Sequence, residues 1–448
     1  MGYPGGGRGS ALISRAVAAR KPAEVSRALF AAAPDRPVTA RGVVLAVAAV
    51  VAAVGVGLLR QPGAGALNTI WAEDGTIFLG QAVDKGPLAA LATSYAGYFH
   101  AVPRVVGALA AAVPAGAAAA TLALSAALCT ALLALLVYVA SAGHLSSQPA
   151  RIIVSAGLVV VPLGQDEVLN SIANFHWYGL YALFWVLLWS PRGRAGQAVA
   201  VVTTLLVATS DILVVAFVPL ALFRALRRGD DGRRDRFGLT LAGTLAAGLI
   251  VQFAGLAGGS SSRALSPDPV LAVSGYLLRA VPGPVVGQRW LGSEMGARWV
   301  LLAGLAWLVV VAVVLVAVRG LTRPAWVLAS VAALYSAGLY LLPVVLSGLA
   351  ATRYAVAPGL LVVVTLVALL QPGGRADRRP LYLLAALLAV VAAVNLRIDN
   401  PRAHGPLWSD ELARARAVCT TADQPAGIVI APRVDPPWTV TVHCRDLD

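Results

Sequence analysis

The sequence predicts an all-α protein, a polytopic bundle of transmembrane helices, and three observations support this fold class. First, the 448 residues are 58% hydrophobic and only 12% charged, with a mean hydropathy of +0.78, whereas soluble domains carry about 25% charged residues. Second, uncharged runs such as Gly42–Leu59, Thr121–Ala142 and Trp299–Val318 reach the roughly 17–25 residues that a helix needs to cross the hydrocarbon core. Third, these runs are rich in Ala, Val and Leu and do not alternate, which disfavours a transmembrane β-barrel.

About eleven apolar segments are candidate membrane spans, although several of them are short for a full crossing. The consecutive segments 197–209 and 212–223 form either one long helix or two short helices that meet at Asp211. The candidate segments are 42–60, 119–141, 152–164, 176–190, 197–209, 212–223, 237–257, 298–318, 325–346, 355–370 and 380–396.

Arginine-containing loops set the predicted orientation. The basic short loops are Ser190–Gly196, Arg224–Arg236, Arg319–Pro324 and Gln371–Pro380. The positive-inside rule places them in the cytoplasm together with the N-terminus. This requires that 197–223 is a hairpin whose tip, Asp211, faces outward. It also requires that 100–114 does not cross the membrane, and Arg104 with its flanking prolines favours a juxtamembrane or re-entrant helix there.

The predicted orientation divides the chain into three parts. Residues 1–40, rich in Gly, Ala and Arg, are expected to form a disordered basic cytoplasmic tail. Residues 41–397 are expected to form a multi-pass domain of the plasma membrane, with juxtamembrane helices in a first outer loop at 61–118 and a long outer loop at 258–297. The arginines of 258–297 are contrary to the positive-inside rule, which disfavours basic outer loops. Long loops follow this rule less strictly. Residues 398–448 are expected to form a small extracytoplasmic C-terminal segment with some β-structure.

Two cysteines, Cys419 and Cys444, lie in the polar C-terminal segment. In an oxidising exterior we expect them to form a disulfide that closes a small loop around the strand-like runs Gly427–Ala431 and Trp438–His443. The alternative is a pair of unrelated free thiols. Their spacing is not one that metal ligands use.

The net charge of +14 would suggest a nucleic-acid partner in a soluble protein. Here the basic residues flank apolar segments, where they orient helices. Since no basic stretch is both long and interleaved with exposed aromatic residues, we expect no nucleic-acid partner. The expected environment is membrane lipid.

Adjacent acids, Glu73 and Asp74, follow the first apolar segment and stand between Trp71 and Phe78. Carboxylates at a partly desolvated membrane interface can act as a general base or hold a divalent cation such as Mg²⁺ or Mn²⁺. The alternative is that one of them caps the amphipathic run Thr76–Val83. We therefore treat Asp74 and Glu73 as candidate catalytic residues and as tentative metal ligands.

A second polar cluster lies at the predicted outer boundary, where acids, amides and aromatic residues would suit sugar hydroxyls and phosphates. The alternative is an aromatic belt with ordinary loop polar groups. Single residues elsewhere add to this outer face, including an arginine that is costly in a membrane unless it snorkels or binds an anion. The candidate substrate-binding residues are His100, Arg104, Asp166, Glu167, Asn170, Asn174, His176, Asp211, Arg353 and Tyr354.

This arrangement resembles the GT-C superfamily of polytopic membrane glycosyltransferases, and in particular unassigned actinobacterial members. The acidic pair Glu73-Asp74 resembles the acidic pair of the first outer loop in that superfamily, and Asp166-Glu167 resembles its second acidic element. The hairpin within Ala208–Arg228 and the Arg353-Tyr354 pair resemble further features of its members. The resemblance covers roughly residues 40–400.

The resemblance implies transfer of a sugar from a polyprenyl-phosphate donor to a glycan or other cell-envelope acceptor on the outer face. It implies that Asp74 acts as general base or metal ligand, that Glu73 positions substrate, and that Arg353 holds the lipid phosphate. The main alternative is a transporter or flippase for a lipid-linked or envelope precursor, which needs polar groups at mid-membrane depth, broken helices or an inverted repeat. A further alternative is an assembly protein without catalysis, which would tolerate alanine at the acidic positions.

Overall fold

Apolar helices make up most of the chain, and this computed structural model describes residues 22–33, 39–228, 234–258, 266–291, 296–373, 378–421 and 424–447. In those ranges, seven helical segments are long and apolar enough to cross a membrane. They are α3 (Ala40–Leu59), Ala115–Gly143 with α7 (Ala118–Ala140) at its centre, α12 (Arg236–Ala257), Pro269–Val286, α16 (Ala297–Val318), α17 (Trp326–Ser347) and Thr352–Leu369. The prediction of an α-helical multi-pass membrane protein is confirmed at this level.

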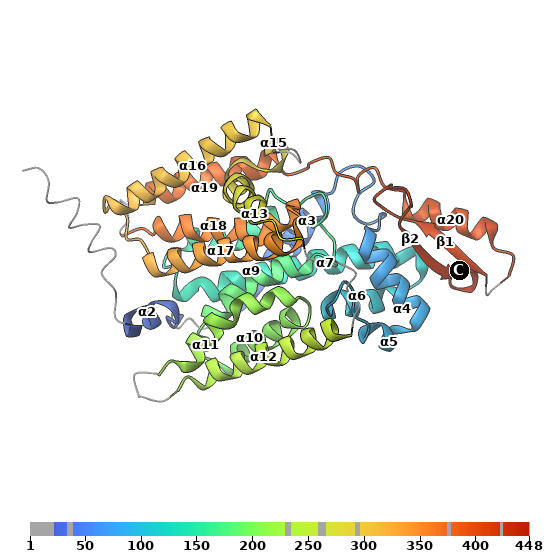
Figure 1. Cartoon of the computed structure of the whole chain (residues 1–448), viewed down its shortest axis with the longest axis horizontal. Coiled ribbons are helices and arrows are strands. Elements are labelled where there is room, and N and C mark those ends of the chain that lie inside the picture. The colour runs from blue at the N-terminus through green and yellow to red at the C-terminus, as the bar shows by residue number, and fades with distance from the viewer. Residues whose placement is uncertain are drawn as a thin grey trace, which may run out of the picture.

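Shorter apolar helices fill the spaces between these spans. They are α6 (Ala101–Ala111), α8 (Gln148–Val160), α9 (Phe175–Leu188), α10 (Arg194–Ala208), η4 (Ile212–Phe217) continued by α11 (Val218–Leu226), and α19 (Arg379–Val394). Every residue of α9 is buried, so this helix forms the centre of the bundle, as Figure 1 shows. A helix that is mostly apolar on every face can occupy such a place because little of it needs water.

One long segment falls where the sequence predicted an outer loop. Residues 269–286 form α13 (Pro269–Gly275), the π-helical turn η5 (Tyr276–Ala280) and α14 (Gly283–Val286), which together have the length and composition of a span. Proline stands in the first turn of both α13 and α14. Proline is tolerated there because the first helical N–H groups have no intrahelical partner, so these prolines mark helix starts.

The N-terminal segment is ordered over part of the predicted tail. Residues 22–29 form α2 (Pro22–Leu29), and Leu29 and Phe30 are buried. The imidazole Nε2 of His144 lies 2.8 Å from the Leu29 carbonyl oxygen, and the Ser190 hydroxyl donates to the Phe30 carbonyl at 3.1 Å. Residues 1–21 and 34–38 lie outside the described ranges. The two apolar side chains explain the docking, because they supply a hydrophobic anchor for an otherwise polar segment.

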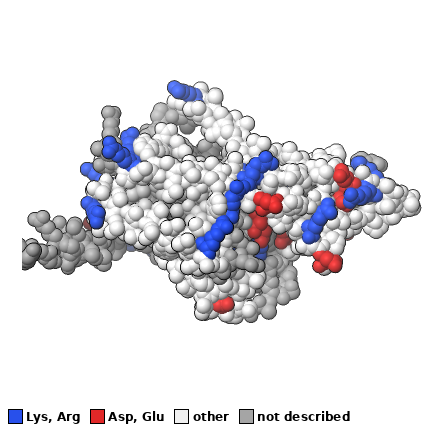
Figure 2. Space-filling view, turned by 90° about the horizontal axis from the view of Figure 1, so that it is seen from above, with Lys and Arg blue, Asp and Glu red and all other residues white. Residues whose placement is uncertain are grey.

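The surface of the helical body is largely uncharged between its two ends. In Figure 2 a broad white area separates the Lys and Arg residues at the left edge from a band of Lys and Arg that crosses the molecule. Many large apolar side chains of these helices are exposed, for example Leu59 at 72% and Leu383 at 72%. Such a continuous apolar surface requires a lipid environment.

The first loop after α3 folds into a chain of short helices. These are η1 (Asp74–Leu79, π-helical), α4 (Gly80–Lys85), α5 (Pro87–Leu91) and α6. Arg104 of α6 is fully buried, and its Nη1 donates to the Gln81 side-chain oxygen at 2.7 Å and to the Ile77 carbonyl at 3.3 Å. Arg104 therefore joins α6 to η1 and α4.

A small C-terminal unit, residues 398–447, lies at the opposite end of the molecule from α2 (Figure 1). It contains α20 (Trp408–Val418), the strands β1 (Pro425–Val429) and β2 (Thr439–His443), and η8 (Cys444–Asp446). The strands pair antiparallel with Pro425 opposite His443.

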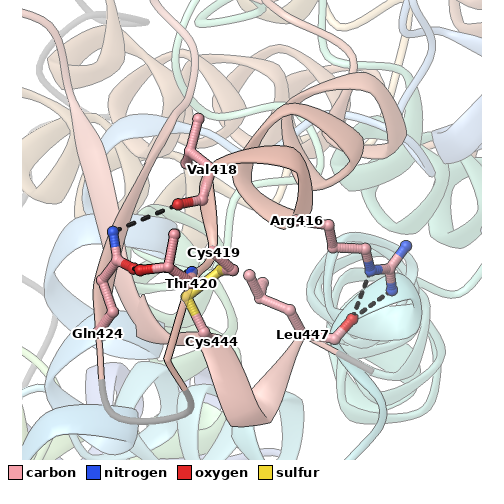
Figure 3. Close-up of a disulfide and its surroundings, with 7 residues drawn as sticks. All are labelled: Arg416, Val418, Cys419, Thr420, Gln424, Cys444 and Leu447. Carbon is pink, nitrogen blue, oxygen red and sulfur yellow. Dashed lines mark hydrogen bonds between the residues drawn. A yellow bond between two sulfur atoms is a disulfide. The ribbon is translucent and has the colours of Figure 1, made fainter.

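The C-terminal unit is cross-linked. A disulfide joins Cys419, just after α20, to Cys444, just after β2 (Figure 3). The guanidinium of Arg416 donates to the Leu447 carbonyl from Nε at 2.7 Å and also from Nη2, and the Gln424 amide donates to the Val418 carbonyl. These bonds hold both ends of the unit against α20.

This unit packs on the loop that carries Glu73 and Asp74. The Ala431 N–H donates to the Ile70 carbonyl at 3.1 Å, and the Ala72 N–H donates to the Ala431 carbonyl at 2.6 Å. The Thr76 hydroxyl donates to the Thr439 carbonyl at 2.7 Å. The backbone just before η1 and its first turn are therefore held by residues more than 350 positions away in the sequence.

Gly75 provides a direct test of this packing. A Cβ atom at Gly75 would collide with the side chains of Ile430, Val440 and Ile70. We expect Gly75→Ala to lower the free energy of unfolding by about 1–3 kcal/mol, the usual cost of overpacking a core. The measurement is the thermal unfolding of the detergent-purified full chain. Gly116→Ala is the matched control, because a Cβ atom there meets nothing within 4 Å. Equal unfolding temperatures for the two variants would contradict the packing.

Candidate functional site

A cavity of about 200 Å³ lies between the helical body and the loop that packs on the C-terminal unit. Its walls come from helix ends: the start of η1, the first turn of α9, the junction of α10 with η4, the last turn of α17 and the turn η6 (Thr352–Ala355) before α18 (Val356–Leu369). Its charged and imidazole residues are Glu73, His100, Glu167, His176, Asp211 and Arg353, and its ring residues are Phe78, Tyr95, Tyr98, Trp177 and Tyr354.

An ion pair forms one wall of the cavity. The Arg353 guanidinium contacts the Glu167 carboxylate, and the two side chains are 27% and 26% exposed. Burial raises the pKa of Glu167, while the charge of Arg353 acts to lower it. The guanidinium carbon also lies 5.2 Å from the centre of the Tyr354 ring. The wall thus presents a partly accessible guanidinium cation, a group that binds phosphates through charge-assisted hydrogen bonds.

The acidic pair divides between two environments. Glu73 is half-buried and lines the cavity. Asp74 is only 1% exposed, lies outside the cavity lining, and accepts hydrogen bonds from the Ala173 N–H at 2.7 Å and the Ser171 hydroxyl at 3.3 Å. Burial raises the pKa of Asp74 to about 7, although the Ala173 N–H and the Arg402 charge act to lower it. Asp74 therefore ties η1 to the 171–173 segment, and Glu73 is the acid that faces the cavity.

His176 and Asp211 form a second pair in the lining. His176 Nδ1 lies 3.1 Å from the Ala173 carbonyl oxygen, and its Nε2 lies 3.6 Å from the Asp211 carboxylate. Because a carbonyl only accepts hydrogen bonds, Nδ1 carries the proton in the neutral ring and Nε2 faces Asp211. The Leu213 N–H donates to Asp211 at 2.6 Å, which makes Asp211 the N-cap of η4. Burial raises the pKa of Asp211 to about 7.

Aromatic rings occupy two sides of the cavity. On one side His100 stacks on Tyr98 with ring centres 4.1 Å apart, and Phe78 and Tyr95 lie 5.5 Å and 5.7 Å from the same imidazole. On the other side Trp177 and Tyr354 lie 5.3 Å apart. The indole N–H of buried Trp177 has no hydrogen-bond acceptor among the described residues. A buried donor without an acceptor is costly, so this N–H favours an oxygen-bearing ligand.

Most of the predicted site residues come together in this lining, including Asn174 and Tyr354. Asp166 and Asn170 do not line it. The Thr352 hydroxyl is 2.7–2.9 Å from the Asp166 carboxylate oxygens, and the Asn170 amide donates to the Gly57 carbonyl at 2.8 Å. Together with Asp74 and Arg104, these residues support the walls from outside the cavity.

Sequence reasoning missed Arg402, which is 3% exposed in the C-terminal unit. Its guanidinium donates five hydrogen bonds, and burial lowers its pKa to about 10 while the charge of Asp74 acts to raise it. The acceptors are the Thr69 hydroxyl and the carbonyls of Ala66, Thr69, Leu169 and Asn170. Arg402 thus joins the two segments that carry the acidic pairs. No local pattern in the sequence distinguishes it from the other arginines.

The proposed metal ligands do not share one site. Glu73 faces the cavity, whereas the Asp74 carboxylate is engaged by Ala173 and Ser171. Within the described ranges no group of three His, Cys, Asp or Glu side chains is placed to hold a metal ion. The two carboxylates of the acidic pair, which were expected to hold Mg²⁺ or Mn²⁺ together, thus lie in different environments.

The cavity has the composition of a ligand-binding site. It joins one cation, several titratable groups and many ring faces in a concave space that several separate segments line. In comparisons with protein-family models, with curated proteins and with solved structures, nothing matches this chain.

Proposed function

We propose that this chain is a membrane glycosyltransferase that moves a sugar from a polyprenyl-phosphate donor to a cell-envelope acceptor. The observation that carries the proposal is the cavity that gathers Glu73, Arg353 and two groups of aromatic rings. These groups supply a base, a phosphate ligand and surfaces for a sugar ring. They stand at helix ends and in the loop between α5 and α6, and in the proposed topology this is the depth at which a lipid-linked sugar presents its phosphate.

The proposed topology keeps the eleven predicted spans in the plasma membrane, with the N-terminus in the cytoplasm and the cavity on the outer side. In this topology 269–286 adds no crossing, because the Asp268 N–H donates to the Val345 carbonyl and the Gln288 N–H donates to the Pro162 carbonyl, so that both of its ends lie at outer helix ends. Basic loops such as Arg319–Pro324 support this orientation by the positive-inside rule. The disulfide Cys419–Cys444 supports it too, because disulfides persist in oxidising compartments. In this topology Asp211 marks the outer tip of the hairpin formed by α10 and α11.

The proposed reaction is a substitution at the anomeric carbon. The Glu73 carboxylate accepts the proton of the acceptor hydroxyl as its oxygen forms the new bond to the anomeric carbon. The bond from that carbon to the donor phosphate oxygen breaks, and the electron pair leaves with polyprenyl phosphate. Arg353 balances the phosphate charge before and after the step. In this scheme Glu73 takes the role of base that the sequence resemblance implied for Asp74.

The remaining lining residues would orient the sugar. The faces of Trp177 and Tyr354 offer flat apolar surfaces, and the Trp177 N–H offers a donor for a hydroxyl or phosphate oxygen. His176 and Asn174 add polar groups beside them. A small number of placed polar groups among apolar walls is the usual way in which a pocket fixes the orientation of its ligand.

The phosphate ligand can be tested with the full chain in proteoliposomes and a panel of polyprenyl-phosphate-linked hexoses and pentoses. We expect the wild-type protein to release polyprenyl phosphate from at least one donor. The double variant Arg353→Met/Glu167→Gln removes the cation without leaving an unpaired acid. We expect it to raise the donor KM by about tenfold or more, since a charge-assisted bond is worth about 1.5–3 kcal/mol.

Glu167→Gln alone is the matched control, because it breaks the ion pair but keeps the Arg353 cation. It should leave the donor KM close to the wild-type value. The proposal is wrong if the wild type moves the intact donor between leaflets without breaking its sugar–phosphate bond, which is the behaviour of a transporter or flippase. It is also wrong if the double variant and Glu167→Gln have the same KM.

A further inference from the structure

An apolar groove of about 270 Å³ lies on the outside of the bundle, away from the cavity that contains Glu73. It runs between α8, α18 and α19, and one end is closed by the 161–162 turn and by Pro284 of α14. The side chains that line it are all Ala, Gly, Ile, Leu, Val or Pro. Ile152 on its edge is 48% exposed and Ala389 is also exposed, so the groove faces the lipid.

The length of the groove fits one leaflet. Its lining residues on α8 extend from Ile152 to Val160, which at 1.5 Å per residue is about 12 Å. Half of a hydrocarbon core of about 30 Å is about 15 Å. The groove therefore covers most of one leaflet, on the side of the molecule that carries the C-terminal unit.

Arg289 is held at the end of this groove that Pro162 lines, and Arg397 lies next to it. The Gln288 N–H donates to the carbonyl of Pro162, a lining residue, at 2.8 Å. Arg289 follows directly in α15 (Gln288–Leu291), and its N–H donates to the Asn395 side chain at 3.0 Å. Its Nη2 donates to the Arg397 carbonyl at 3.0 Å. Arg397 stands five residues beyond Ala392, the last lining residue on α19.

The positive charge at this end is not neutralised by the protein. Arg289, Arg298 and Arg397 are all exposed, and in the described ranges no carboxylate forms an ion pair with any of them. The nearby acid Asp399 is paired with His404 at 2.8 Å. Figure 2 shows a band of Lys and Arg crossing the face of the molecule between the white helical body and the C-terminal unit.

An exposed tryptophan lies beside these arginines. The Arg298 guanidinium carbon lies 5.3 Å from the ring centre of Trp290, whose side chain is 45% exposed. Exposed tryptophans are typical of the boundary between hydrocarbon and headgroups. Arg298 and Arg289 therefore lie beside an exposed tryptophan near one end of the apolar groove.

We propose that Arg289 and Arg397, with the groove beneath them, bind an anionic phospholipid of the membrane: the phosphate lies on the two guanidinium groups and one acyl chain lies in the groove. This inference does not depend on the proposed sugar transfer, because the groove shares no lining residue with the cavity. It also gives a role to Arg289, one of the arginines of the predicted outer loop 258–297 that are contrary to the positive-inside rule.

The test is lipid binding to the detergent-purified full chain, measured by native mass spectrometry with phosphatidylglycerol and with phosphatidylcholine. We expect at least one phosphatidylglycerol to be retained in preference to phosphatidylcholine. Arg289→Gln/Arg397→Gln should weaken phosphatidylglycerol binding by about twenty-five-fold, because each arginine near anionic headgroups contributes about fivefold. Ala389→Trp, which fills the groove, should weaken the binding of both lipids at this site.

The matched control is Arg319→Gln/Arg323→Gln, which removes two exposed arginines from the loop between α16 and α17. It should leave the phosphatidylglycerol preference unchanged. The proposal is overturned if both lipids bind equally to the wild type, or if the 289/397 variant keeps the preference. It is also overturned if Ala389→Trp leaves phosphatidylglycerol binding unchanged, since the acyl chain would then lie elsewhere.

Discussion

Glu73→Gln is expected to lower the turnover of sugar transfer by about 10²–10⁴-fold, the usual contribution of a general base. The substitution keeps the size of the side chain and removes only its ability to accept a proton. Because Glu73 is the acid of the adjacent pair that lines the cavity, the loss should fall on kcat rather than on the donor KM. The measurement is release of polyprenyl phosphate by the full chain in proteoliposomes, at acceptor concentrations above KM.

Two further variants make this result specific. Asp84→Asn removes an exposed acid from α4 of the same loop and should leave kcat unchanged. Asp74→Asn keeps the Oδ1 atom that accepts from the Ala173 N–H and the Ser171 hydroxyl. It should still lower the unfolding temperature, because it removes the carboxylate charge that acts on buried Arg402. If Asp74→Asn abolished transfer at an unchanged unfolding temperature while Glu73→Gln stayed active, Asp74 would be the base, as the sequence resemblance implies.

The long apolar helices could be predicted because the bilayer requires their length and composition. The predicted segments 42–60 and 237–257 correspond to α3 and α12. The segment 269–286 was missed because its prolines and Arg279 resemble loop residues. Hydropathy alone does not show that a proline will occupy a first helical turn, where it is harmless.

The site could be predicted only in outline. Acids and amides at the ends of apolar segments correctly indicated which helix ends carry the site. These helix ends meet in one cavity. Which of two adjacent acids faces that cavity depends on the helical phase of η1, whose π-helical geometry is not visible in the sequence. The aromatic group of Tyr95, Tyr98 and His100 also depends on how the loop folds back on η1.

Long-range contacts were the least predictable part of the site. The walls depend on the C-terminal unit, whose residues contact the loop before η1 across more than three hundred positions. A single sequence contains no signal for such a pair, because local pattern reports only local structure. Arg402 is the clearest example, since its five acceptors lie at 66–69 and 169–170.

Arg402→Met is expected to produce the largest loss of stability, about 3–5 kcal/mol in the free energy of unfolding. Methionine fills a similar space but donates no hydrogen bonds, so four buried carbonyls and the Thr69 hydroxyl lose a partner at once. Breaking a buried charge network by removing one member costs this amount. The measurement is thermal unfolding of the detergent-purified chain. Arg433→Met, at an exposed position of the same unit, is the control and should unfold like the wild type.

A double-mutant cycle separates the two consequences of this change. The charge of Arg402 acts on buried Asp74, so Arg402→Met leaves that carboxylate without its cation. Asp74→Asn in the same chain removes the stranded charge, and the combined loss should be smaller than the sum of the two single losses by about 0.5–3 kcal/mol. A strictly additive result would show that Arg402 acts through its carbonyl partners alone. If Arg402→Met and Asp74→Asn together lowered the free energy of unfolding no more than Arg433→Met does, the C-terminal unit would not hold the acidic segments together.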